Sequence, residues 1–401
     1  MGPSPPAATD GSKTWTPSYL FPEAEDDQNP WNKIHSHLKA NEVKAAVCAA
    51  FELPVGDDFT YHASASVNLS QVEAAIHAGR ANGLHAWYLE RQPLLLDSAE
   101  SPDNHVGDID HGVLGQSTSQ TSGYPPPADV YAYISLFDPS KVAANSLKSF
   151  GANAKKGSIR ATVADYLSSK RHLDSSISVS KLKVIPTKDG RTPVGHQNPA
   201  LDFWAYSVSA LEYAGPNRNT SFVRSSHHLL PVFMHHFGCV APSYEALQII
   251  KKLASGKSVI DMGSGNGYWT LMLRRLGQNV VAIDSGQSKW RTVWVPDTVA
   301  TDGIQYLRRR SGCPDSLILL VYPVVGCDFT RKVIESYTGD VICVAGTQNG
   351  NGYTGFKDQM IDEYMAIERP GWTKVAQIPL PSFAGKDDAL FAFRRTSPAS
   401  Q

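Results

Sequence analysis

The sequence predicts an α/β protein in which a mostly helical region precedes a largely parallel sheet. Three observations predict this class. Apolar, β-branched runs of strand length recur between residues 258 and 346. Segments with helical periodicity separate these runs, and strands that alternate with helices form βαβ units. A glycine-rich turn directly follows the first run, which is typical of a strand that leads into a helix beside a bound ligand.

The N-terminal part is predicted to contain a disordered tail over residues 1–29, rich in Pro, Ala, Ser, Asp and Glu, and a mostly helical region over 30–240. Residues 98–127, rich in Ser, Gly, Thr and Pro, predict a flexible loop within it. We expect this region to cap the sheet and to select the substrate. Apolar spacing predicts helices over 31–51, 68–89, 140–150, 158–170 and 199–213.

Residues 258–267 carry the most informative motif, Ser-Val-Ile-Asp-Met-Gly-Ser-Gly-Asn-Gly. An apolar run ends at Asp261, and Gly263, Gly265 and Gly267 follow before a helix-like segment. Glycine lacks a Cβ, so it permits positive φ and the close approach of a ligand to the backbone. The backbone N–H groups at the start of the following helix favour an anionic group.

Two common nucleotide-binding motifs do not fit this turn. The dinucleotide-binding motif needs a third glycine where this chain has the bulky Tyr268. A phosphate-binding loop that ended at Gly256 would need another glycine where Lys251 stands, and it would have to precede a helix instead of a strand.

Further strand-like segments follow in order. Residues 279–284 end in Asp284, which lies 21 positions after Gly263; an acid there can accept hydrogen bonds from ribose hydroxyls. Five later segments follow in order. They are a turn with Asp302 (300–307), two buried-strand patterns (315–323 and 340–346) and two closing strands (373–378 and 389–394).

The pattern Asp-x-Gly-x-Gly-x-Gly, together with these segments in this order, resembles class I S-adenosylmethionine-dependent methyltransferases. The resemblance covers residues 242–396 and identifies no subfamily. It implies a seven-stranded, Rossmann-like sheet over 241–396 that closes with an antiparallel hairpin, followed by a short tail over 397–401. It also implies S-adenosylmethionine (SAM) as cofactor and S-adenosylhomocysteine as product.

The resemblance further implies the cofactor contacts. The glycine-rich turn meets the methionine and ribose portions, Asp284 holds the ribose and Asp302 reads the adenine. Asp261 organises the turn and the amino group of the cofactor. The residues predicted to bind the cofactor are Asp261, Gly263, Ser264, Gly265, Asn266, Gly267, Asp284, Ser285, Asp302 and Gly303.

Four histidines, His227, His228, His235 and His236, lie just before the predicted sheet. Imidazole titrates near neutral pH, so His235 and His236 are candidate general bases; structural histidines are the alternative. A metal site is not predicted, because Pro231 interrupts the helix that would align them and no acid or cysteine completes a known ligand spacing.

The ends of the later strands provide further candidates. Tyr322 ends the fourth strand, and ligands in open α/β sheets lie at the carboxyl ends of strands. Val321-Tyr322-Pro323-Val324 departs from the Asp/Asn-Pro-Pro-Tyr/Phe signature of enzymes that methylate the amino groups of nucleic acids, and a structural tyrosine remains an alternative. A glycine-rich loop with Gln348, Asn349 and Tyr353 is predicted as a substrate lid, with a plain connector as the alternative. Lys386-Asp387-Asp388 reads as a solvated turn.

Composition constrains the partners. The chain has 401 residues, 42% of them hydrophobic and 19% charged, with a net charge of −1. This balance gives no general attraction to nucleic acid or to anionic membranes. The five cysteines form no Cys-x-x-Cys pair and, with no membrane-length apolar run and no signal sequence, predict the cytoplasm.

We therefore expect methyl transfer to an O, N or S nucleophile, most simply of a small molecule. Three alternatives remain open: methylation of a protein or an RNA, a rearrangement that uses the cofactor without methyl transfer, and a regulator that retains only the fold. The sequence leaves the oligomeric state open.

Overall fold

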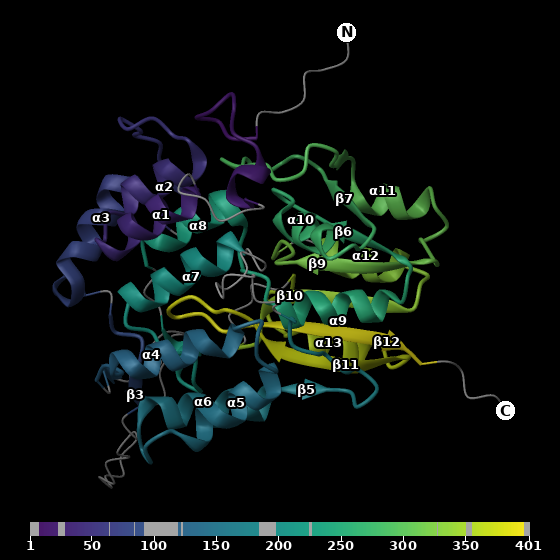
Figure 1. The fold of residues 1–401 in the computed structure, drawn as a ribbon. Helices are drawn as coiled ribbons and strands as arrows, with labels where there is room; N and C mark the ends of the chain where they lie inside the picture. Colours follow the sequence, from purple (N-terminus) through teal and green to yellow (C-terminus); the bar gives the residue numbers. More distant parts are fainter. Residues whose placement is uncertain are drawn as a thin grey trace, which may run out of the picture.

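The computed structural model describes residues 8–22, 29–63, 65–83, 85–91, 119–121, 123–183, 198–223, 227–326, 328–349 and 355–396. A helical region precedes an α/β region, and the two lie side by side (Figure 1). Among the described helices, none has the length and apolar composition that crossing a bilayer requires.

Within the described residues, the helical region also contains five short strands, which form two pairs and one edge strand. Its helices begin at good caps: Asn68 caps α3 in a capping box, and Asn198 caps α7 ahead of an N1 proline. The elements are α1 (Pro30–Lys39), α2 (Val43–Phe51), β1 (Tyr61–His62), β2 (Ser66–Val67), α3 (Leu69–Ala78), β3 (Leu89–Arg91), β4 (Ser119–Thr121), α4 (Pro127–Ile134), α5 (Ala143–Ala152), α6 (Ile159–Lys170), β5 (His172–Leu173), α7 (Pro199–Ala210) and α8 (Leu229–Phe237).

The α/β region alternates strands and helices as predicted, until the closing pair of strands. Its elements are α9 (Tyr244–Ala254), β6 (Ser258–Met262), α10 (Tyr268–Arg275), β7 (Val280–Asp284), β8 (Val299–Ala300), α11 (Gly303–Arg308), β9 (Ser316–Val321), α12 (Phe329–Ser336), β10 (Val341–Thr347), α13 (Ile361–Glu368), β11 (Trp372–Pro379) and β12 (Asp388–Arg395).

The central sheet has the strand order β5-β11-β12-β10-β9-β6-β7-β8. The strands β10, β9, β6, β7 and β8 are parallel, and β12 runs antiparallel between β10 and β11. The predicted Rossmann-like sheet with a closing antiparallel hairpin is therefore confirmed. The described sheet has eight strands instead of the predicted seven, because β5 of the helical region pairs with the edge strand β11.

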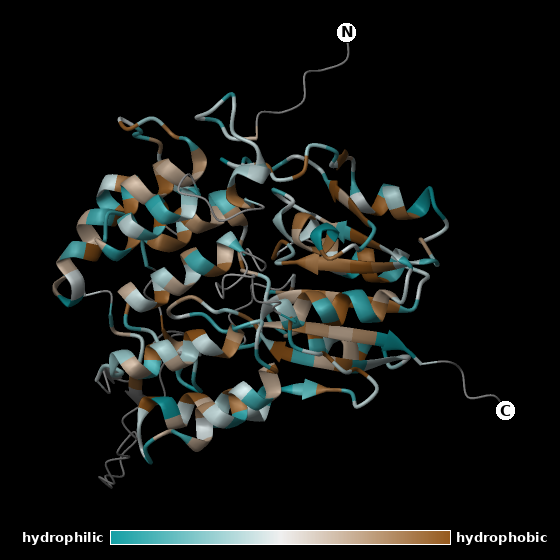
Figure 2. Ribbon diagram, in the orientation of Figure 1, coloured by the Kyte–Doolittle hydropathy of each residue, from teal (hydrophilic) through white to brown (hydrophobic). Residues whose placement is uncertain are grey.

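Two hydrophobic cores cover the two faces of this sheet. Alternate residues of β9 point to opposite faces: Leu317 and Leu319 enter the larger core, and Ile318 and Leu320 enter the smaller one. The larger core is shared with α9, α10 and the helical region, whereas the smaller one packs under α11, α12 and α13. The brown strands in Figure 2 show this two-sided burial.

The helical region lies against the carboxyl ends of the parallel strands. The loop between β11 and β12 begins beside these ends and inserts into the helical region. Trp204 of α7 donates to the carbonyl of Ser382 (2.9 Å), and Tyr213 donates to the carbonyl of Lys386 (2.8 Å). The edge where ligands bind in open α/β sheets is thus covered by the helices.

Three sequence predictions differ from the structure. The helix predicted over 31–51 is two helices, which a positive-φ residue, Asn41, separates. The helix predicted over 68–89 ends at Ala78 in a 3₁₀ turn. Residues 8–22 of the predicted disordered tail are folded, because Trp15 and Leu20 enter the larger core.

Candidate active site

The glycine-rich turn between β6 and α10 has the predicted backbone conformation. Gly263, Gly265 and Gly267 have φ values of 76°, 57° and 81°, and Gly267 is the N-cap of α10. Residues with a Cβ rarely adopt this left-handed region, so each position favours glycine. The turn therefore exposes backbone between the end of β6 and the start of a helix.

The three glycines have different surroundings. A Cβ on Gly265 would lie 2.9 Å from the indole of Trp290, and one on Gly267 would lie 2.2 Å from Val295. A Cβ on Gly263 would meet only the ring of Phe329, at 4.0 Å, within the described structure. Two glycines are thus required by packing, whereas Gly263 borders open space that suits a ligand.

Asp284 at the end of β7 is held against this turn. Its carboxylate accepts hydrogen bonds from the backbone N–H of Gly265 (2.9 Å) and of Gly286 (2.7 Å). The side chain is therefore oriented before any ligand binds. Each carboxylate oxygen retains a lone pair for a further donor, such as a ribose hydroxyl.

Asp261 lies beneath the turn and is fully buried. One carboxylate oxygen accepts from Thr270 (2.6 Å), and the other, Oδ1, has no hydrogen-bond partner among the described residues. The buried hydroxyl of Ser264 likewise lacks a partner within the part of the chain that is described. Burial raises the pKa of Asp261 to about 6. Unsatisfied buried polar atoms are costly, and a polar ligand at this turn would supply their partners.

The other predicted cofactor residues are also close to this turn. Asp302 is exposed and caps α11 by accepting from the N–H of Gln305 (2.8 Å). A Cβ on Gly303 would lie 3.5 Å from the same Phe329 ring that borders Gly263. Ser285 is exposed, and the side chain of Asn266 is engaged by the backbone of Tyr268 and of His236.

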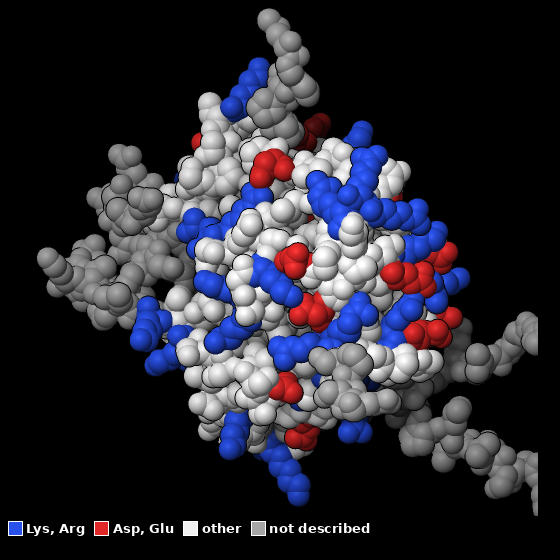
Figure 3. Space-filling view, turned by 90° about the vertical axis from the view of Figure 1, so that its right-hand side faces the viewer, with Lys and Arg blue, Asp and Glu red and all other residues white. Residues whose placement is uncertain are grey.

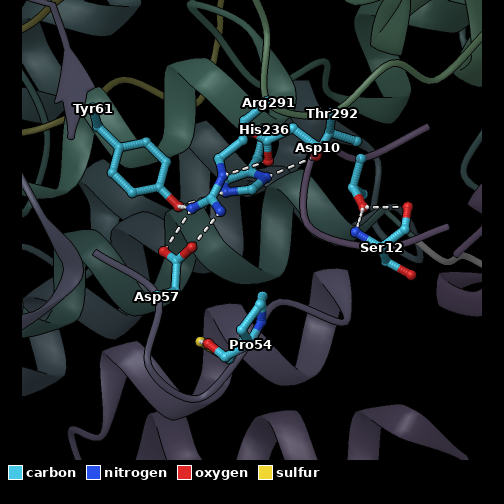
Figure 4. Close-up of polar contacts among 10 residues, drawn as sticks. Asp10, Ser12, Pro54, Asp57, Tyr61, His236, Arg291 and Thr292 are labelled. Carbon is cyan, nitrogen blue, oxygen red and sulfur yellow. Dashed lines mark hydrogen bonds and ion pairs between the residues drawn. The ribbon is translucent and has the colours of Figure 1, made fainter. Parts of the chain in front are cut away.

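His235 is partly exposed, whereas His236 is buried in the helical region. The His236 ring is fully buried and stacks on Phe51 with 3.9 Å between ring centroids. Its two nitrogens share hydrogen bonds with the hydroxyls of Tyr61 (3.1 Å) and Thr292 (2.8 Å), as Figure 4 shows. Burial holds its pKa well below the ordinary value. This placement argues against the predicted role as general base, and we infer a structural role.

His235 is also engaged with the chain. Its Nε2 lies within hydrogen-bond distance of the carbonyl (3.0 Å) and the N–H (3.3 Å) of His62. The two predicted bases therefore join α8 to β1, and neither is positioned beside Tyr322.

Tyr322, by contrast, lies in a polar cluster at the carboxyl edge of the sheet. The residue has a φ of 51°, a conformation that is strained for a side chain of this size. Its hydroxyl donates to Asp388 Oδ1 (2.7 Å) and accepts from Lys386 Nζ (3.3 Å). Asp388 is fully buried, burial raises its pKa, and its Oδ2 has no partner among the described residues.

Asp387 forms the neighbouring part of this cluster. Its buried carboxylate accepts from Tyr166 of α6 (2.6 Å) and from the amide of Gln348 (2.9 Å). Burial raises the pKa of Asp387 to about 7. The prediction of a solvated turn at Lys386-Asp387-Asp388 is wrong, because both acids are 0% exposed.

Two predicted substrate residues, Gln348 and Asn349, line a polar pocket of about 350 Å³ beside this cluster. Tyr166 and Lys170 of α6 form part of the same wall. The third predicted substrate residue, Tyr353, lies outside the described residues.

His227 reaches the Lys386 side of the cluster. Burial and the charge of Lys386 lower its pKa to about 3, so the ring is neutral near physiological pH. The ring stacks on Phe383 at 5.4 Å, and its Nε2 has no partner in the described ranges. The sequence placed this histidine in a cluster of four, but the structure separates it from His235 and His236.

The described residues contain no group of three or more His, Cys, Asp or Glu side chains placed to hold a metal ion. On the face opposite the helical region, basic side chains are interspersed with acidic ones, as Figure 3 shows.

No protein-family model and no curated protein matches this sequence. Solved structures with partial likeness include magnesium protoporphyrin IX methyltransferase from Synechocystis PCC 6803 with bound SAM (10% identity, 44% of this chain and 89% of that chain, TM-score 0.28). Another is 1,6-didemethyltoxoflavin-N1-methyltransferase from Burkholderia thailandensis (15% identity, 38% and 78% covered, TM-score 0.25). A third is a protein of the NADB-Rossmann superfamily from Streptococcus agalactiae (12% identity, 38% and 69% covered, TM-score 0.27). By its own strand order, this chain has a Rossmann-like α/β fold with an antiparallel closing hairpin.

Proposed function

We propose that this protein is a SAM-dependent methyltransferase that acts on a small molecule. The observation that carries the proposal is that Gly263, Asp284 and Asp302 lie at the carboxyl ends of the adjacent parallel strands β6, β7 and β8, with Asp284 bonded to the turn and space beside Gly263. The unpartnered oxygens of Asp261 and Ser264 at the same turn fit a polar ligand with donors, as the amino group and hydroxyls of SAM provide. When bound, SAM supplies a methyl group that its positive sulfonium makes electrophilic.

The polar cluster at the carboxyl edge supports an acceptor site. An acceptor hydroxyl or amine that donates to Tyr322 Oη would pass its proton along the Tyr322 hydroxyl to Asp388. The raised pKa of Asp388 favours this transfer, because a carboxylate of higher pKa is a stronger base. Lys386 next to Tyr322 would stabilise negative charge on the acceptor oxygen.

The size of the neighbouring space favours a small acceptor. The pocket beside Gln348 has a volume of about 350 Å³, which falls in the range of small-molecule sites. The helices also cover this edge, and the near-zero net charge gives no general attraction to RNA.

Cofactor binding is tested first by calorimetric titration of SAM into the wild type and into Asp284→Asn. The asparagine retains an oxygen for the N–H of Gly265 but loses the charge that a ribose hydroxyl meets. We expect affinity to fall by about 1–3 kcal/mol. Asp340→Asn is the matched control, since Asp340 is also a partly exposed acid and pairs with Lys257 at the amino ends of the strands. Equal affinity of Asp284→Asn and the wild type would contradict the ribose assignment.

Methyl transfer is tested with methyl-labelled SAM and size-fractionated extract of the source cells. Label in the small-molecule fraction supports the proposed acceptor class and gives a product for mass analysis. Label in macromolecules would replace that class with a protein or an RNA, which protease or nuclease treatment identifies. SAM binding without label transfer would instead indicate a rearrangement or a regulator.

A further inference from the structure

The outer wall of the glycine-rich turn is formed by the connection between β7 and β8, residues 285–298, here called the β7–β8 segment. Its Trp290 covers Gly265 and its Val295 fills the space beside Gly267. The backbone N–H of Trp294 donates to the carbonyl of Asn266 within the turn (2.8 Å). The position of this segment therefore decides the shape of the turn.

The β7–β8 segment contains no helix and no extended strand in the described structure; its one ladder contact is an isolated bridge between Thr292 and Thr9. Backbone groups that lack a regular partner must be fixed by tertiary contacts. In this segment the N–H of Val293 donates to the carbonyl of Ala8 (2.8 Å). The carbonyl of Arg291 accepts from the N–H of Asp10 (3.2 Å).

These partners belong to residues 8–15, here called the N-terminal strap. Trp15 at its end is buried, packs edge-on against Trp294 at 5.3 Å and donates to the carbonyl of Ala50 (2.9 Å). Ser12 and Thr14 donate to Glu52 at 2.9 and 3.0 Å. The strap thus lies between α2 and the β7–β8 segment.

Arg291 joins the strap to the rest of the molecule. Its guanidinium, 3% exposed, donates to Asp10 (2.7 Å), to both oxygens of Asp57 and to the hydroxyl of Tyr61 (2.7 Å). Figure 4 shows these side chains converging from separate segments. Such a planar fork fixes the direction of each partner, which a point charge does not.

We propose that Arg291 is a positioning residue for the cofactor site, and that docking of the N-terminal strap is energetically coupled to SAM binding. The strap holds Arg291, Arg291 holds the β7–β8 segment, and Trp290 and Val295 of that segment shape the glycine-rich turn. The inference rests on the proposed function. Coupling between two sites is reciprocal, so SAM also stabilises the docked strap.

The first test compares SAM affinity in Asp10→Ala and in Asp340→Ala. Both acids are about half exposed, at 45% and 52%, and each pairs with one basic side chain. Asp10 pairs with Arg291, whereas Asp340 pairs with Lys257, away from the strap. We expect Asp10→Ala to weaken SAM binding roughly five-fold or more, the lower end of usual coupling. Asp340→Ala should match the wild type, and Asp10→Glu should restore most of the affinity.

The second test measures the strap directly. Lys13 is exposed within the strap, and trypsin cuts there only when the strap leaves its docked position. We expect SAM to slow release of the fragment that ends at Lys13 several-fold in the wild type and less in Asp10→Ala. A residue that serves only the stability of the fold would not make this cleavage depend on SAM.

The outcomes separate the two proposals. If the wild type does not bind SAM, the proposed function fails, and the coupling fails with it. If the wild type binds SAM but Asp10→Ala binds equally well and cleavage at Lys13 ignores SAM, the coupling alone is overturned. Unchanged kcat at saturating SAM with a raised KM for SAM in Asp10→Ala would support positioning over chemistry.

Discussion

Two buried acidic clusters of this protein hold their carboxylates with different kinds of partner. Asp57, 7% exposed, has both oxygens on the guanidinium of Arg291. Asp387, 0% exposed, accepts from the neutral groups of Tyr166 and Gln348. Both sites remove a carboxylate from water, but the partner of Asp57 carries a full opposing charge, whereas Asp387 is held by neutral groups and Lys386 lies on the Tyr322 side of its cluster.

This difference separates a structural site from a functional one. A buried ion pair with a forked donor orders the chain and gives up no proton near neutral pH. Acids buried beside neutral donors have raised pKa values and exchange protons in the range where enzymes work, and such groups mark active sites. The comparison therefore points to the carboxyl edge of the sheet for chemistry and to the Arg291 cluster for organisation.

The largest expected effect is the loss of the opposing charge in the first cluster. Arg291→Met leaves Asp57 buried without its cation, so we expect the free energy of unfolding to fall by about 3–5 kcal/mol. Urea denaturation measures this loss of unfolding free energy. Lys257→Met, which breaks the exposed pair with Asp340, is the control and should cost about 1 kcal/mol or less. Equal losses in the two variants would contradict the structural role of the Arg291 cluster.

A substitution in the second cluster should lower turnover and leave the free energy of unfolding nearly unchanged. Asp388→Asn keeps the shape of the side chain but removes the proton acceptor, so we expect turnover to fall by about 10²-fold or more. Stability and SAM affinity should stay near wild type, because the amide keeps an oxygen that accepts from Tyr322 and removes a buried carboxylate whose charge burial disfavours. Kinetics with the identified acceptor, together with thermal unfolding, check this.

Tyr322→Phe sharpens this test, since it breaks the same proton path at its other end. Residues that act as one unit give losses that do not add. The double variant should therefore be no slower than the slower single variant, and fully additive losses would show that Tyr322 and Asp388 act separately.

The smallest effect is a change in pH dependence. Burial raises the pKa of Asp387 from 3.8 to about 7. Between these values the folded protein holds a proton that the unfolded chain releases, so this group lowers stability as pH rises through that range. Its slope approaches about 1.4 kcal/mol per pH unit.

Asp387→Asn should remove that contribution. The difference in unfolding free energy between the variant and the wild type, measured across the range between the two pKa values, 3.8 and about 7, isolates Asp387 from the other titrating groups. A difference that stays constant from acid to neutral pH would show that the carboxylate is not buried as the structure has it.

The glycine-rich turn was predictable because its signals are local. The strand before Asp261 is an apolar β-branched run, the glycines have the positive φ that their spacing suggested, and Asp284 ends the next strand. Each of these features is decided within a few residues of the chain, where periodicity and turn chemistry are informative.

The carboxyl-edge cluster was predictable only in part: Tyr322 and Gln348 were candidates from the sequence, whereas distant segments decide the burial of the two acids. Lys386-Asp387-Asp388 has the composition of a solvated turn, yet Tyr166 and Tyr213 reach it from more than 170 positions away. The surroundings of His236 were hidden for the same reason: four neighbouring histidines suggest chemistry, but Phe51 and Tyr61, which contact the ring, lie about 175 or more positions earlier in the chain.

The insertion of the β11–β12 loop into the helical region has a consequence for biosynthesis. Trp204 and Ser382, which it joins, are 178 positions apart, so at usual translation rates the ribosome makes the second roughly 9–36 s after the first. During that interval the nascent helices carry an apolar surface whose partner has not yet been made. Nascent chains in this state are prone to aggregate and are protected by chaperones. Slower translation of the last third of the message should therefore lower the soluble yield of this protein, and added chaperone should restore it.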